Sequence, residues 1–216
     1  MVPDGIDYKF LKAFKLFLLS RLKKKNEQFI ICTGGGKLAR EYMNTLAKEK
    51  INVYTQDLMG IACTRLNAQL FANFLGEASN KEIPTTLEEV ADLAKNNKII
   101  VCGGLESGRT TDGTTASIAE YLNVKQMINI TNVKGLYEKD PKKYRNAKLI
   151  KKISYAGFKK LMQSIKEHPG QHFVLDSLAA EIIERSKITA IIVGKNIRNL
   201  AKVLNKEKFI GTVIGD

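Results

Sequence analysis

Two short apolar runs, each followed by consecutive glycines, constrain the fold of this chain most strongly. Residues 29–33 lead into three glycines, and residues 98–102 lead into two. Both runs have the length and isoleucine content of strands buried on both faces, and each precedes a segment with helical periodicity. Strand, glycine turn and helix in succession are the parts of a right-handed βαβ unit. We therefore expect a parallel sheet.

The same alternation continues to the end of the chain and predicts an α/β fold. Residues Thr85 and Thr86 precede Glu88 and Glu89 by three positions, which predicts a helix start with a capping box. We expect helices over 8–22, 37–49, 58–74, 86–95, 111–122, 155–165, 177–186 and 196–204, and strands over 29–33, 98–102, 126–130, 189–193 and 211–214. This order predicts a three-layer sandwich with a mostly parallel central sheet and helices on both faces.

Length and composition indicate a globular protein of one domain. The chain has 216 residues, of which 44% are hydrophobic and 26% are charged, and no linker divides it. Its three cysteines show no paired spacing, which favours a reduced, cytoplasmic protein over a disulfide framework. Two histidines and no CxxC pattern argue against a zinc site, and no apolar run approaches the roughly 20 residues of a membrane span.

The net charge of +13 has three explanations: a nucleic-acid partner, a small anionic substrate, or a lysine-rich solvated surface. The basic residues are spread along the chain and few aromatic residues accompany them. We therefore expect a solvated surface and no nucleic-acid partner.

Ligand sites of open α/β sheets lie where the strands end, so four loops are candidates. The first contains Gly34, Gly35 and Gly36, which let the backbone approach an anion, followed by Lys37 and Arg40 on the expected first helical turn. The alternative is a tight turn with two solvated bases. A triple glycine fits neither the Walker A nor the GxGxxG pattern.

The second loop, residues 103–112, supplies hydroxyl groups, the cation of Arg109 and the carboxylate of Asp112. Thr111 or Asp112 is expected to cap the next helix, which leaves ligand binding open. The third loop, residues 131–141, has Tyr137 to pack on a base and Asp140 to accept from a nucleoside, or it is a surface excursion. In the fourth loop, a helix N-cap explains Asp176, and no catalytic role is assigned to His172.

In this order the loops resemble the signatures of the amino acid kinase superfamily, most closely its archaeal-type uridylate (UMP) kinases. The matching segments are TGGGKLAREY from Thr33, GGLESGRTTDGTTA from Gly103 and ITNVKGLYEKDP from Ile130, with QDLMGIACTRLNA, LDSLAAEIIERS and GTVI in addition. A related isopentenyl phosphate kinase would carry a histidine soon after the first glycine loop, where this chain has LAREYMN.

The resemblance implies transfer of the γ-phosphoryl group of ATP, with Mg²⁺, to UMP. Acceptor binding would lie in residues of about 1–122 and ATP binding in about 123–216. UMP would contact Gly35, Asp57, Leu105, Glu106, Ser107, Gly108, Arg109, Thr110 and Thr111. ATP would contact Gly36, Arg40, Thr131, Tyr137 and Asp140, and Arg40 and Asp112 are the expected catalytic residues. The resemblance also implies a cytoplasmic homo-oligomer, a hexamer built from dimers.

Two departures from the family pattern bear on activity. Family members open with a strand and a Gly-Gly-Ser turn, whereas this chain begins with residues that resemble those just after that turn. We therefore expect it to lack a central strand and part of the phosphate cradle. Lys134 also stands where the family usually has an acidic residue. The alternatives to a UMP kinase are a truncated, non-catalytic nucleotide-binding or regulatory protein of this fold, and a kinase of another small phosphate or carboxylate substrate.

Overall fold

The structure is a computed structural model that describes residues 5–139, 141, 143–166 and 175–216. The chain divides into two compact units, residues 1–114 and 115–216. The elements in chain order are α1 (Tyr8–Lys24), β1 (Phe29–Cys32), α2 (Gly36–Lys48), α3 (Val53–Leu75), the 3-10 turn η1 (Gly76–Ala78), α4 (Leu87–Asn96), β2 (Ile99–Cys102), α5 (Thr111–Tyr121), β3 (Gln126–Thr131), β4 (Lys152–Ile153), α6 (Tyr155–Lys166), α7 (Ser177–Arg185), β5 (Thr189–Gly194), α8 (Ile197–Leu204) and β6 (Gly211–Ile214).

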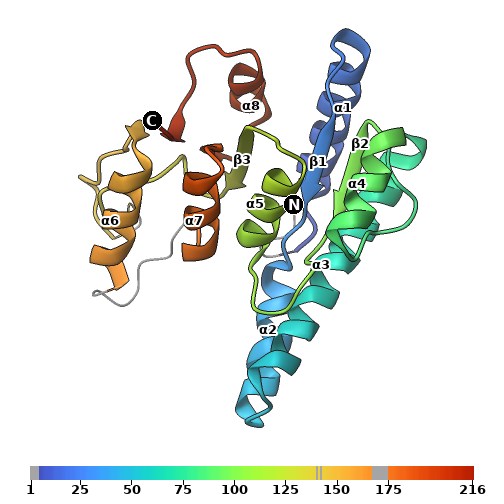
Figure 1. The fold of residues 1–216 in the computed structure, drawn as a ribbon, viewed down its shortest axis with the longest axis horizontal. Helices are drawn as coiled ribbons and strands as arrows, with labels where there is room; N and C mark the ends of the chain where they lie inside the picture. Colours follow the sequence, from blue (N-terminus) through green and yellow to red (C-terminus); the bar gives the residue numbers. More distant parts are fainter. Residues whose placement is uncertain (1–4, 140, 142, 167–174) are drawn as a thin grey trace. The chain divides into compact units, whose positions relative to one another are not determined.

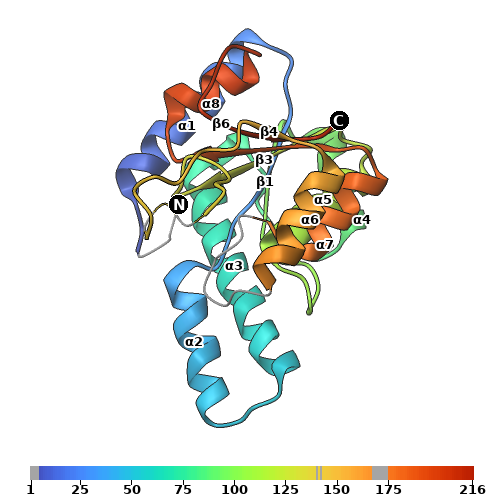
Figure 2. The same ribbon diagram turned by 90° about the vertical axis from the view of Figure 1, so that its left-hand side faces the viewer.

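The first unit is built on the parallel pair of β1 and β2 (Figure 1). Phe29 lies opposite Ile99 and Cys32 opposite Cys102, so both strands end at the same level. All four residues of β2 are buried, with α3 and α4 packed against the strand. Helices α2 and α3 lie side by side (Figure 2). This packing places the loops that follow β1 and β2 next to each other.

The second unit has a four-stranded sheet in the order β3-β5-β6-β4. Ala190 and Ile192 of β5 lie in the core that α5, α6 and α7 cover, whereas Ile191 and Val193 lie in the core with Val203 of α8. Figure 2 shows α8 on one side of this sheet and the other three helices on the opposite side. Helices therefore cover both faces, as the alternation predicts.

The strand pairings are mostly parallel, as expected, with one exception. β5 and β6 run antiparallel, whereas β1–β2, β3–β5 and β4–β6 are parallel. A short connection leads from α8 back to β6. It suits an antiparallel pairing of β6 with β5, because only parallel neighbours need a crossover connection. The strands form two separately hydrogen-bonded sheets, one in each unit, where the sequence suggested one.

Helix ends follow their capping residues. Thr86 accepts from the Glu89 N–H, and the Glu89 carboxylate accepts from the Thr85 N–H and hydroxyl, which confirms the expected capping box. These hydrogen bonds lower the pKa of Glu89 below its ordinary value. The prediction for α3 was wrong at its start: the helix begins at Val53, five residues early, because the Asn52 side chain caps the Thr55 N–H at 2.9 Å.

Candidate functional site

The loop after β1 is anchored at its base and closely packed against α3. The Thr33 hydroxyl donates to the Thr64 carbonyl oxygen at 2.8 Å, and the Asn67 amide donates to the Gly34 carbonyl oxygen at 2.8 Å. A side chain at Gly35 would overlap the Cβ of Ala39, so the backbone turns into α2 where only glycine fits. Gly36 has a φ of 66°, a conformation that favours glycine.

Helix α2 begins at Gly36, one residue earlier than expected. Lys37 therefore lies in the first turn, but Arg40 opens the second turn, which corrects the expectation that both share the first. Both side chains are exposed, and Lys37 forms an ion pair with Glu41 at 3.5 Å. In any helix, the backbone N–H groups that have no partner within the helix lie in the first turn. Arg40 lies one turn beyond that position in α2.

The loop after β2 is held by α3 through close backbone contact. The Gly104 N–H donates to the Thr64 hydroxyl at 2.7 Å, and Arg65 donates to the carbonyl oxygens of Gly104 at 3.0 Å and Leu105 at 3.3 Å. A Cβ on Gly103 would lie 2.7 Å from the Arg65 nitrogen. Glycine at this position is therefore required by the helix behind it.

Asp57 joins α3 to the middle of the same loop. Its Oδ2 accepts from the Ser107 hydroxyl at 3.1 Å and from the Gly108 N–H at 2.8 Å, where Gly108 has a φ of 77°. Arg109 forms an ion pair with Glu106 at 3.0 Å. The structure thus brings Asp57 together with Glu106, Ser107, Gly108 and Arg109, although about fifty residues separate them.

The loop after β2 leads into α5 through Thr110. The Thr110 hydroxyl accepts from the N–H groups of Asp112 at 3.1 Å and Gly113 at 3.3 Å. Thr110 is therefore the N-cap, and the expectation that Thr111 or Asp112 serves as the cap was wrong, because the helix already begins at Thr111. The two glycine loops meet here, since a Cβ on Gly34 would lie 3.7 Å from the Thr111 hydroxyl oxygen.

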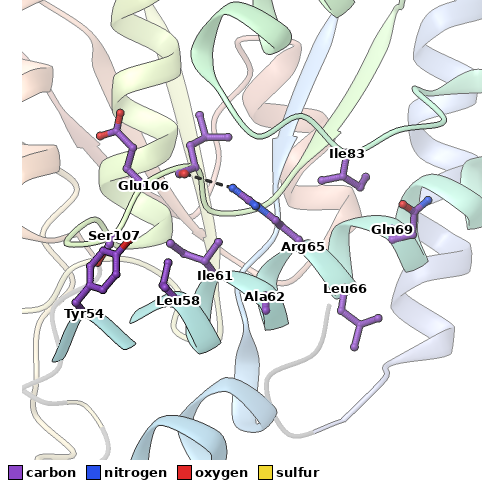
Figure 3. A pocket seen from close by; sticks show the side chains of 11 residues that line it. Tyr54, Leu58, Ile61, Ala62, Arg65, Leu66, Gln69, Ile83, Glu106 and Ser107 are labelled. Atoms are coloured by element: carbon purple, nitrogen blue, oxygen red, sulfur yellow. Dashed lines mark hydrogen bonds between the residues drawn. The ribbon is translucent and has the colours of Figure 1, made fainter. Parts of the chain in front are cut away.

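A groove of about 710 Å³ lies between α3 and the loop after β2 (Figure 3). Arg65 reaches across it to the loop, and Tyr54, Leu58 and Ile61 form part of its apolar wall. Sequence reasoning missed Thr64, Arg65 and Tyr54. Thr64 and Arg65 lie in the matching segment QDLMGIACTRLNA, but neither was singled out, because the contacts that they make with the loop after β2 are tertiary.

The remaining predicted residues lie in the second unit. Thr131 ends β3, and its carbonyl oxygen accepts from the Lys195 N–H at 2.9 Å. Tyr137 is half-buried and forms an antiparallel bridge with Leu149. Lys134 is exposed. Asp140 and His172 lie outside the described residues.

Among the described residues, no group of three or more His, Cys, Asp or Glu side chains comes together as a metal cage. In the same part of the chain, none of the helices has the length and apolarity that crossing a membrane requires.

Comparison with known proteins places these loops in a family. The model of the amino acid kinase family matches residues 18–194. The chain is 35% identical to a uridylate kinase of Methanobrevibacter smithii over 91% of its own length and 87% of that protein. It is 37% identical to a uridylate kinase of Methanocaldococcus jannaschii, again over 91% of this chain and 87% of that protein.

Solved structures agree with the sequence relatives. The crystal structure of uridylate kinase from Archaeoglobus fulgidus matches with a TM-score of 0.86 and 33% identity, over 97% of this chain and 94% of that one. The UMP kinase of Ureaplasma parvum, at 20% identity and a TM-score of 0.74 over 98% of this chain and 91% of that one, shares the fold. The expected resemblance is confirmed: this chain belongs to the amino acid kinase family.

Proposed function

We propose that this chain is a UMP kinase, which transfers the γ-phosphoryl group of ATP to UMP and gives UDP and ADP for pyrimidine nucleotide synthesis. The observation that carries the proposal is the joined pair of glycine loops at the ends of β1 and β2, linked to α3 through Asp57. This arrangement occurs in a chain whose relatives over about nine-tenths of its length are uridylate kinases.

We assign UMP to the first unit. The backbone of Gly35 and the loop of Leu105, Glu106, Ser107, Gly108, Arg109, Thr110 and Thr111 surround the acceptor, with Asp57 behind the loop. Hydroxyl groups and backbone N–H groups suit a ribose and a phosphate. Asp57 already accepts two hydrogen bonds from the loop, so it also sets the loop's position for the acceptor.

We assign the adenosine end of ATP to the second unit, near Thr131, Tyr137 and Asp140, and the phosphates to Gly36 and Arg40. Acceptor binding thus falls to residues of about 1–122 and ATP binding to about 123–216, close to the boundary between the compact units. The planar guanidinium of Arg40 can bind two phosphate oxygens at once. Lys134, which lies in the same loop as Tyr137, adds positive charge where the family usually has an acidic residue.

Phosphoryl transfer needs positioning and charge neutralisation more than acid–base chemistry. We propose that the N–H groups of the glycine loops, together with Arg40 and Arg109, stabilise negative charge on the transferring oxygens. Asp112, in the first turn of α5, is the proposed second catalytic residue. We propose that Mg²⁺ enters with the ATP phosphates, because Mg²⁺ keeps several waters and binds readily through substrate phosphates.

We also propose that the chain is a cytoplasmic homo-oligomer, a hexamer built from dimers. Helix α3 carries an apolar stripe that is exposed in the single chain, including Tyr54, Leu58 and Leu66. Only two of the 23 residues of α3 are charged, Asp57 and Arg65, and both bind the loop after β2. On an uncharged face, two copies of a chain with net charge +13 bring no like charges into direct contact.

The acceptor preference tests the proposal. The full chain is incubated with ATP and Mg²⁺ and with UMP, CMP, AMP or GMP in turn, and ADP release is measured. UMP is expected to be preferred, because each group left unpaired by another base costs about 1–3 kcal/mol. Equal rates with AMP or CMP would contradict the acceptor assignment. Binding of UMP without ADP release would favour the non-catalytic alternative.

A further inference from the structure

Two of the three cysteines lie side by side at the ends of β1 and β2. Cys32 and Cys102 are register partners on the parallel strands, and their Sγ atoms are 3.2 Å apart. Neighbouring strands lie about 4.8 Å apart, within the Cα separation of about 4.4–6.8 Å that disulfides span. The two side chains therefore need to approach by only about 1 Å to reach the S–S bond length of about 2.05 Å.

The two thiols differ in access. Cys102 is fully buried, whereas Cys32 is half-buried. The hydrogen bond with Cys32 and burial raise the pKa of the Cys102 thiol well above its ordinary value. Because Cys32 is the more exposed residue of the two, we expect an oxidant in solution to react with its sulfur first and the Cys102 sulfur to react next.

We propose that Cys32 and Cys102 form a site of reversible disulfide modification by hydroperoxides. The Cys32 thiolate attacks a peroxide oxygen, which breaks the O–O bond, releases an alcohol and leaves a sulfenic acid on Cys32. The Cys102 sulfur then attacks the Cys32 sulfur, and its proton joins the departing hydroxide as water. Two thiols and one hydroperoxide thus give a disulfide, an alcohol and water. Thiols reduce the bond again by exchange.

The position of this pair links it to the binding loops. Thr33 and Gly103 directly follow the two cysteines, and the Thr33 N–H donates to the Cys102 carbonyl oxygen at 2.9 Å. Gly103 has no free space on its α3 side, so a displacement of Cys102 is passed on to the loop after β2. Oxidation is therefore expected to slow catalysis, and this consequence alone depends on the proposed function.

The test counts thiols rather than activity. The folded full chain is treated with hydrogen peroxide, its remaining thiols are alkylated, and its peptides are mapped by mass spectrometry. We expect a Cys32–Cys102 disulfide, alkylation of Cys63 only after unfolding, and recovery of both thiols with dithiothreitol. Cys63, which is buried in α3, supplies the matched control: a folded Cys63→Ala variant forms the same disulfide.

Variants separate the two steps. Cys32→Ser abolishes the reaction of folded protein with peroxide, whereas Cys102→Ala, which keeps the buried position apolar, leaves a sulfenic acid on Cys32 that dimedone traps. Oxidation of Cys32 to sulfinic acid in the unaltered chain without a disulfide would overturn the proposal. So would a disulfide that involves Cys63. Slower UMP phosphorylation after oxidation would show that the disulfide affects catalysis. Unchanged turnover would contradict that effect alone and leave the disulfide site supported.

Discussion

At the scale of single residues, Asp57 joins helix α3 to the loop after β2. One carboxylate oxygen accepts from both Ser107 and Gly108, so one side chain determines the position of a loop distant in sequence. Hydrogen bonds to a charged group contribute about 1.5–3 kcal/mol. The affinity for the acceptor is therefore expected to depend on Asp57.

Asp57→Ala is expected to lower kcat/KM for UMP by about 10- to 100-fold, mainly through KM, because both hydrogen bonds to the loop are lost. Asp57→Asn keeps an acceptor oxygen and should therefore show a smaller decrease in kcat/KM. Steady-state kinetics and amide exchange of residues 105–111 measure the two effects. Asp92→Ala, an exposed aspartate of α4, is the control. An Asp57→Ala variant with the wild-type KM would contradict this role.

Arg40 tests the phosphate assignment. Arg40→Ala is expected to lower kcat by about 100-fold, the usual effect of removing one group that stabilises transition-state charge. Arg40→Lys should recover only part of the rate, since a point charge cannot replace a planar fork. Lys48→Ala, at the exposed end of the same helix, should keep the wild-type rate. If folded Arg40→Ala turns over normally, Arg40 is a solvated base.

At the scale of elements, the edge of β2 is closed by a side chain instead of a strand. The carbonyl oxygens of Lys98 and Cys102 accept from β1, whereas Val101 presents its backbone groups to the other edge. There the buried Asn80 amide accepts from the Val101 N–H at 2.7 Å and donates to the Val101 carbonyl oxygen at 2.9 Å. One asparagine thus satisfies the groups that an adjacent strand would otherwise pair.

Asn80→Ala should lower the free energy of unfolding by several kcal/mol, because each buried backbone group left without a partner costs about 1–3 kcal/mol. Urea unfolding of both proteins measures the difference. Asn73→Ala, at an exposed asparagine on α3, is expected to change stability by less than about 0.5 kcal/mol. Equal stability of the two variants would show that Asn80 does not support β2.

The positions of helices and strands could be predicted where local sequence signals agree. The predictions failed mainly where tertiary contacts determine the element. The prediction was correct for the apolar runs of β1 and β2 and for the Thr85–Thr86 capping box, because neighbouring residues alone determine these features. The early start of α3 was missed although its cause, the Asn52 cap, is local, and the two-residue strand β4 was missed as well. β4 is held by its pairing with β6, which no local pattern of two residues reveals.

The candidate site divides in the same way. The glycine loops could be found from sequence because short strands ending in glycine have few alternatives. The Asp57 contact with Ser107 and Gly108, and the supporting role of Arg65, depend on how α3 crosses the end of β2. Such packing is not encoded in the local sequence, and the family resemblance supplied Asp57, Ser107 and Gly108 as UMP contacts without the hydrogen bonds that join them.

At the scale of the whole molecule, the apolar stripe of α3 bears on assembly. Leu66 is 61% exposed, and Tyr54 and Leu58 are exposed on the same helix. Leu66→Glu is therefore expected to shift the protein toward the monomer in analytical ultracentrifugation, since the added charge would have to be buried between copies. Leu16→Glu is the matched control, because Leu16 of α1 is 59% exposed. Equal sedimentation of both variants would exclude the α3 face as the contact.

Phosphoryl transfer from ATP to UMP is tested most directly by following the phosphoryl group itself. The full chain is incubated with UMP, Mg²⁺ and ATP carrying a radioactive γ-phosphate, and the products are separated. We expect label in the β-phosphate of UDP, formed in step with unlabelled ADP and dependent on UMP. Label released only as inorganic phosphate, or labelled ATP left intact while UMP is bound, would contradict it.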